Sequence, residues 1–170
     1  GDSNTATGGD ISLTSGNGAA GMTSGTVTLA TSNADNGNSG KLLLSSGQAT
    51  NSGSVHIESG SATGQPAGDI SLIVGDSSGI GGSISIAAGV STTSTGGSVQ
   101  LQSGSSSSLK SGEVNVLSAA STESSGQVLL STGNANSADS GAISMSTGDV
   151  QDGISGNIVL QAGKVNSGVA

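Results

Sequence analysis

The stretch Gly97-Ser98-Val99-Gln100-Leu101-Gln102-Ser103-Gly104 contains the unit on which the fold depends. Two aliphatic residues flank one polar residue, a serine follows two positions later, and glycine lies at both ends. Alternation of apolar and polar residues has the period of a half-buried β-strand, and valine and isoleucine favour that state. Val99 and Leu101 are therefore expected to point inward, and Gln102 outward.

The same unit occurs eleven times in register, and the glycine that opens it recurs every 13 to 16 residues. The first aliphatic position holds Ile11, Val27, Leu42, Val55, Ile70, Ile84, Val99, Val114, Val128, Ile143 and Ile158. The second holds Leu13, Leu29, Leu44, Ile57, Leu72, Ile86, Leu101, Val116, Leu130, Met145 and Leu160. The opening glycines are Gly9, Gly25, Gly40, Gly53, Gly68, Gly82, Gly97, Gly112, Gly126, Gly141 and Gly156.

The segments between the aliphatic pairs are rich in Gly, Asn, Asp and Ser, which are turn-forming residues. A small residue recurs near the second position of these segments and is expected to face the aliphatic pair from a return wall. These residues are Ala34, Ala49, Ala62, Ser77, Ser91, Ser106, Ser121 and Ala135. Because every unit runs in the same direction, the repeat predicts strands that stack in parallel rather than a meander.

The predicted fold is therefore all-β, a single-chain parallel β-solenoid of about eleven coils, each of about 15 residues. The aliphatic pairs should form two inward ladders in a thin aliphatic core. Small residues two positions further on should continue the inward face, as at Ser15, Thr31, Ser46, Ser59, Ser103 and Thr147. Residues 1–170 are expected to form one uninterrupted array. Because Ser167-Gly168 begins a twelfth unit, this array is expected to be a fragment of a longer one.

Composition bounds the core and leaves two alternatives open. The chain has 31 Gly, 1 Pro and no Phe, Trp, Tyr or Cys. Since aromatic residues bury the most area each, any core must be thin. A Gly/Ser-rich flexible linker has a similar composition, although a linker has no reason to repeat the aliphatic pairs. Strands that pair only between chains are the second alternative.

The charge balance excludes several partners. The net charge is −8, and Lys41, Lys110 and Lys164 are the only lysines, with no arginine present. Nucleic-acid binding requires clustered basic residues, so no nucleic-acid partner is expected. Apolar runs reach only three residues, as at Leu42–Leu44, far below the roughly 20 that a bilayer crossing needs. No membrane insertion is expected.

No residue pattern predicts catalysis, and we expect no enzyme, no cofactor and no catalytic, cofactor-binding or metal site. His56 is the only histidine, and its position between Val55 and Ile57 predicts an exposed side chain. A zinc site would need a second His or Cys, and a Ser-His-Asp triad would need a nucleophile beside His56.

A binding module is the alternative functional interpretation, with ice, a glycan or calcium as ligand. Calcium-binding solenoids repeat a G-G-x-G-x-D pattern, which this chain lacks. The calcium alternative is then an isolated weak site near Asp149 and Asp152. Ice-binding solenoids present an outward Thr-x-Thr array, whereas this chain has one such pair, Thr26 and Thr28.

With its S-G-x-Φ-x-Φ-x-S-G units, in which Φ is aliphatic, the chain resembles the Ser/Gly/Thr-rich β-solenoid repeats of long secreted and cell-surface proteins of microbes and algae. That resemblance implies an extracellular or cell-surface structural segment, such as a filament, stalk or adhesive fibre, acting as a stiff rod. Self-association through coil ends or lateral faces is expected, since neither visible end carries a cap.

Overall fold

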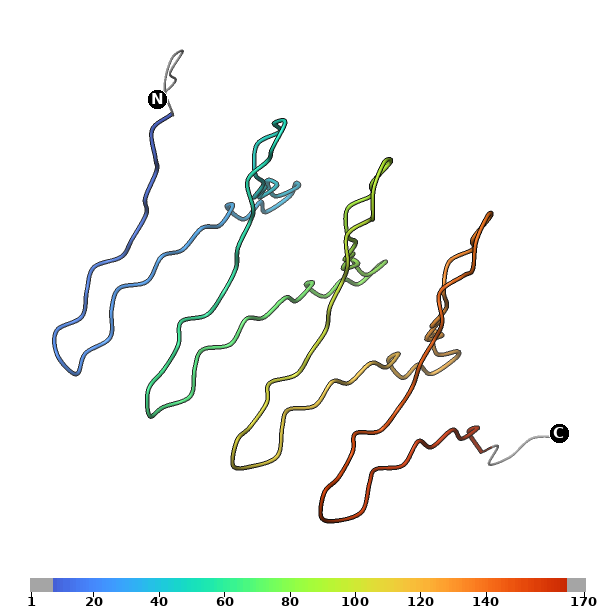
Figure 1. Ribbon diagram of the computed structural model, residues 1–170. Helices are drawn as coiled ribbons and strands as arrows, with labels where there is room; N and C mark the ends of the chain where they lie inside the picture. Colours follow the sequence, from blue (N-terminus) through green and yellow to red (C-terminus); the bar gives the residue numbers. More distant parts are fainter. Residues whose placement is uncertain (1–7, 165–170) are drawn as a thin grey trace. The chain divides into compact units, whose positions relative to one another are not determined.

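The computed structural model describes residues 8–164, and neither a helix nor a β-strand occurs among them. Figure 1 accordingly draws this part as a plain ribbon, without coiled helices or strand arrows. Irregular, extended segments alternate with short bends. The prediction of an all-β parallel β-solenoid with eleven coils is therefore wrong for the described chain, which is mostly coil.

Bends divide the described chain at a regular spacing. Successive bends begin 14 or 15 residues apart, and each lies between the aliphatic pairs of two consecutive units. Figure 1 shows the chain reversing direction near residues 20 and 64. The ten bends occupy residues 20–22, 35–37, 49–51, 63–65, 78–80, 92–94, 107–109, 122–123, 136–138 and 151–153.

Glycine is required at three of these bends because the backbone there is left-handed. The φ angles are 79° at Gly21, 84° at Gly64 and 140° at Gly153. Residues with a Cβ rarely adopt this region, whereas glycine does so without steric penalty. No other type of residue in the described part has a positive φ.

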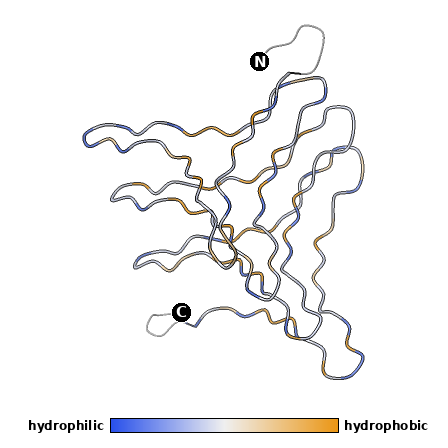
Figure 2. Ribbon diagram, turned by 90° about the vertical axis from the view of Figure 1, so that its left-hand side faces the viewer, coloured by the Kyte–Doolittle hydropathy of each residue, from blue (hydrophilic) through white to orange (hydrophobic). Residues whose placement is uncertain are grey.

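The predicted thin aliphatic core is absent from residues 8–164. No side chain there is buried, and the large aliphatic residues range from 40% exposed at Val74 to 99% at Ile11. Val99 is 63% exposed and Leu101 75%, so the expected inward ladders do not form. Figure 2 shows the hydrophobic residues in short stretches along the chain.

Backbone hydrogen bonding explains why no sheet forms. Within residues 8–164 the backbone–backbone bonds run from Met22 to Ala19, Gly25 to Gly16, Gly97 to Gly89 and Gly112 to Gly104. Each closes a local turn or loop. None joins one extended segment to the segment a full repeat away, and a sheet requires such a ladder of bonds.

The composition gives an energetic reason why the single chain forms neither a core nor a sheet. The units have few aliphatic side chains, no aromatic one and several glycines, which lose the most conformational entropy on ordering. The chain exposes 17160 Å², whereas a folded monomer of 15.8 kDa exposes about 7,300 Å² and its unfolded chain about 23,000 Å². The exposed area of the single chain is therefore closer to that of an unfolded chain than to that of a folded monomer.

The chain divides into two units, Gly1–Ile84 and Ser85–Ala170. In the described part of the first, bends run from 20–22 to 78–80, and in that of the second from 92–94 to 151–153. The same alternation of extended segment and bend thus occurs in each. The prediction that residues 1–170 form one array stays a prediction.

Candidate functional site

The most regular structural feature is a close contact at the base of nine of the ten loops between consecutive aliphatic pairs. There the glycine that opens a unit lies against the residue two positions after the second aliphatic of the preceding unit. We call each such pair a loop neck. A Cβ added to the glycine would lie 2.7–3.9 Å from the side chain of its neighbour. The nine necks are Ser15–Gly25, Thr31–Gly40, Ser46–Gly53, Val74–Gly82, Ala88–Gly97, Ser103–Gly112, Ser118–Gly126, Thr132–Gly141 and Thr147–Gly156.

Three necks are also closed by a backbone hydrogen bond. The amides of Gly25, Gly97 and Gly112 donate to the carbonyls of Gly16, Gly89 and Gly104 at 2.9, 2.9 and 3.0 Å. The small side chains at these necks, Ser15, Ala88 and Ser103, are half-buried, whereas nearly all other described residues are exposed. Local order is thus concentrated at the necks rather than along the aliphatic pairs.

Close approach of the neighbouring residue explains why glycine occupies the necks. At Gly97 a Cβ would meet both the Ala88 Cβ and the Gly89 nitrogen at 3.2 Å. At Gly68, in contrast, nothing lies within 4 Å, and the loop before it contains Pro66 and the left-handed Gly64. In the sequence, the opening glycines indicate only the period of the repeat. The sequence does not reveal their contact role, because the same pairing occurs at Ser59 and Gly68, where no contact forms.

Serine hydroxyls stabilise four of the ten bends. The Oγ atoms of Ser77, Ser91, Ser106 and Ser121 accept backbone amide hydrogen bonds from residues two or three positions ahead, at 2.9–3.4 Å. Such serine turns are common local motifs. The expectation that these serines face the aliphatic pair from a return wall is wrong. Alanine occupies the same position at Ala34, Ala49, Ala62 and Ala135 and has no hydroxyl to offer.

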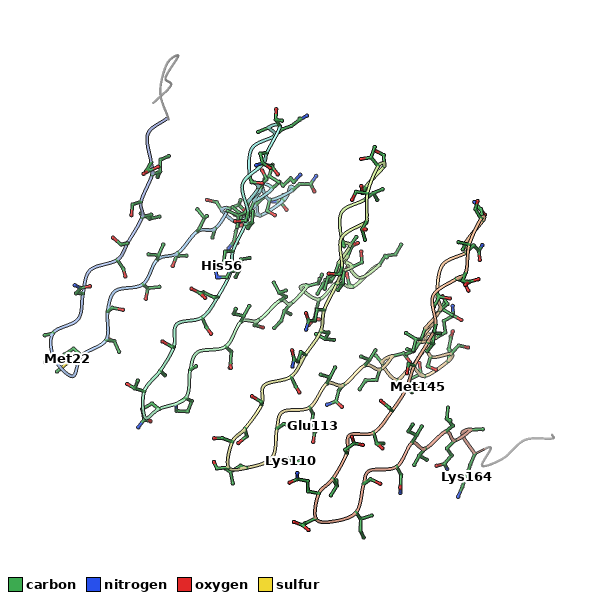
Figure 3. The ribbon with its side chains drawn as sticks, in the orientation of Figure 1. Met22, His56, Lys110, Glu113, Met145 and Lys164 are labelled. Atoms are coloured by element: carbon green, nitrogen blue, oxygen red, sulfur yellow. The ribbon has the colours of Figure 1, made fainter. Side chains whose placement is uncertain are left out.

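Loop 104–112 has both a neck closed by a backbone hydrogen bond and a serine turn. Its neck bond joins Gly112 to Gly104, and Ser106 Oγ accepts from the Leu109 amide at 2.9 Å and the Ser108 amide at 3.4 Å. Lys110 Nζ lies 3.1 Å from Glu113 Oε1, just beyond the neck (Figure 3). Because these two side chains are 84% and 64% exposed, the ion pair contributes only about 0.2–1 kcal/mol.

Ser106→Ala should therefore loosen this loop. The Leu109 amide loses its acceptor, so its hydrogen exchange, measured by NMR, should accelerate about twofold to tenfold. Ser107→Ala is the matched control, since within residues 8–164 the loop's side-chain hydrogen bonds to backbone amides involve Ser106 and not Ser107. Ala135→Ser should have the opposite effect and slow exchange in bend 136–138. Equal acceleration in the two alanine variants would contradict the assigned role of Ser106.

The residues weighed for catalysis or ligand binding lie apart. His56 Nε2 is 3.1 Å from Glu58 Oε2, on the same extended segment, and both side chains are about three-quarters exposed. The pair forms an ion pair only when His56 is protonated. Within residues 8–164, no three His, Cys, Asp or Glu side chains gather in a way that could hold a metal ion, and Asp149 and Asp152 have no third acidic partner.

Two further properties concern the described residues alone. No pocket opens among them. None of their segments forms a helix with the length and apolarity that a bilayer crossing requires. The expectations of no enzymatic activity, no cofactor and no nucleic-acid partner stay predictions.

No protein-family profile, curated protein or solved structure matches this chain. The repeat, the loop necks and the exposed aliphatic pairs are the features of the chain that bear on its function.

Proposed function

We propose that the chain is a structural repeat segment of extracellular or cell-surface material, such as a filament, stalk or adhesive. The observation that carries this proposal is the recurrence of one loop along the chain, with the same neck at nine positions. A repeated local contact gives most units the same chemistry, which suits a protein that acts through length and number rather than through one site.

The surface chemistry supports the same proposal. Between the aliphatic pairs the chain is rich in Ser, Thr, Asn and Gly, and charged residues make up only 8% of it. Neighbouring chains of this composition repel each other weakly and can form hydroxyl and amide hydrogen bonds. Three lysines and no arginines leave few cleavage positions for trypsin-like proteases, which suits exposed material.

Stiffness is not part of the proposal. The rod expected from the sequence needed coils joined by a ladder of backbone hydrogen bonds, and the bonds in residues 8–164 close local loops instead. Any load-bearing or adhesive property of the chain must then come from what its exposed segments contact.

Immunogold electron microscopy tests the proposal, with antibodies against the chain applied to the cells that make it. Label on surface or secreted fibrous material is expected, whereas label confined to the cell interior would overturn the proposal. Saturable binding of calcium, ice or a glycan by the dilute chain would favour the binding-module alternative. For calcium, calorimetric titration can compare binding by the wild type with binding by Asp149→Asn/Asp152→Asn.

A further inference from the structure

We propose that the exposed aliphatic segments are pairing sites for a second copy of this chain, joined edge to edge as extended strands. An aliphatic segment is the aliphatic–x–aliphatic stretch of each unit. The inference rests on the proposed function and identifies the partner through which it would act. The segments are residues 11–13, 27–29, 42–44, 55–57, 70–72, 84–86, 99–101, 114–116, 128–130, 143–145 and 158–160.

The first observation is the amount of apolar surface left uncovered. Within these segments the exposed fractions include 74% at Ile86, 75% at Leu101 and 84% at Leu160. The chain exposes 17160 Å², about 9,800 Å² more than a folded monomer of its mass, whereas a stable interface buries about 1,200–2,000 Å² in total. The uncovered surface of the chain therefore exceeds the area that a stable interface needs.

The second observation is the state of the backbone. The four backbone–backbone bonds within residues 8–164 lie in bends and loop necks, so the amides and carbonyls of the aliphatic segments have no backbone partner there. An exposed, extended segment with unpaired backbone groups is a template for pairing with another chain. Val or Ile, which favour strands, occupies the first aliphatic position of every segment except 42–44.

The third observation is the placement of charge. The residue between the two aliphatics is Ser, Thr, Leu, Gln, Asn, Val or, in one segment, His56, so no segment contains a Lys, Asp or Glu. Identical segments can therefore lie opposite each other without placing like fixed charges face to face, which would be destabilising. The net charge of −8 comes from residues outside these segments, such as Asp35 and Asp76.

The repeat period indicates why the partner is a copy of the same chain. The bends that separate the segments begin 14 or 15 residues apart. A second copy presents its own segments with the same spacing, so pairing at one site brings the next pair into reach and raises its effective concentration. A cationic protein would instead be held by scattered acidic residues, and salt would weaken that attraction.

The test uses sedimentation velocity together with far-UV circular dichroism over a range of chain concentrations. We expect a coil spectrum for the dilute monomer, and a strand signal that grows together with larger species as concentration rises. Salt should promote the association because it screens the repulsion between chains of net charge −8. The Debye length falls from about 30 Å at 0.01 M to about 3 Å at 1 M salt.

Two variants with equal charge separate apolar pairing from charge effects. Leu101→Asp/Val116→Asp/Leu130→Asp places three charges in aliphatic segments and should raise the concentration needed for association at least about tenfold. Ser107→Asp/Thr122→Asp/Ser137→Asp places three charges in bends, and its threshold should change about twofold or less. Because the described monomer buries no side chain, neither variant removes a core whose loss could mimic the result.

Each outcome decides the proposal. A chain that stays monomeric at every concentration, associates without strand signal, or responds equally to both variants overturns it. Association that salt weakens points to a charged contaminant and overturns it as well. The proposed function can be judged separately. If the chain is monomeric but immunogold label lies on extracellular material, the pairing is overturned and the proposed function stands. If the chain self-associates but the label is confined to the cell interior, the pairing stands and the proposed function is overturned.

Discussion

A calorimetric scan of the dilute, monomeric chain is expected to show no cooperative unfolding transition. A globular protein of 170 residues absorbs about 120 kcal/mol on unfolding near 60 °C. That heat comes from disrupting a packed interior, and no side chain among residues 8–164 is buried. Loop necks and serine turns should instead loosen gradually and independently, as expected for local structure of low stability. A sharp heat-absorption peak from the monomer would contradict the described structure.

The paired variants Leu101→Asp and Gln102→Asp test the same point at one position. If Leu101 were inside a core, its replacement by Asp would bury an unpaired charge and destabilise the fold by several kcal/mol. Because Leu101 is 75% exposed, both variants should behave alike and match wild type in far-UV spectrum and heat capacity. A spectral change confined to Leu101→Asp in the dilute monomer would indicate a packed interior.

The position of the bends could be predicted from the sequence, but the pairing of the extended segments could not. Gly, Asn and Ser clusters fall between the aliphatic pairs, and bends such as 35–37 and 136–138 lie within them, because turn preference is a local property. Pairing depends on contacts between distant segments. Alternation at Val99 and Leu101 indicates that a strand is compatible with the residues, without supplying a partner for it.

Two local details show what the repeat pattern missed. Ser106 was expected to face an aliphatic pair, whereas its hydroxyl bonds the amides of its own bend. Ser103 was expected to continue an inward face, whereas it lies against Gly112 at a loop neck. In both cases a side-chain position was inferred from a core that does not form. Contacts within about ten residues, set by small side chains and hydroxyl groups, determine the positions instead.

Gly18→Ala is expected to disrupt loop 16–25 through a steric clash with the backbone. A Cβ at Gly18 would lie 2.5 Å from the Thr23 carbonyl oxygen and 2.7 Å from the Met22 carbonyl oxygen. Real Cβ atoms do not approach that closely, and both obstacles are backbone atoms, so no side-chain rotation can relieve the clash. At Gly82 a Cβ would lie 2.7 Å from the Val74 Cγ1, and a rotation of Val74 can remove that contact.

Relief at Gly18 requires the backbone of residues 18–23 to move. That movement should break the 2.9 Å bond from the Met22 amide to the Ala19 carbonyl, and the 2.9 Å neck bond from the Gly25 amide to the Gly16 carbonyl. Amide exchange measured by NMR should accelerate about twofold to tenfold at Met22 and Gly25, the range for losing one exposed hydrogen bond. Nuclear Overhauser contacts between Ser15 and Gly25 should disappear.

Gly16→Ala is the matched control within the same loop. Nothing lies within 4 Å of the position that its Cβ would occupy, and its carbonyl can still accept from Gly25. Exchange at Gly25 should therefore stay near the wild-type rate in this variant. If both variants leave Gly25 unchanged, the neck bond is not formed in solution. If both accelerate exchange equally, loss of backbone freedom at glycine rather than the close approach at Gly18 governs the loop.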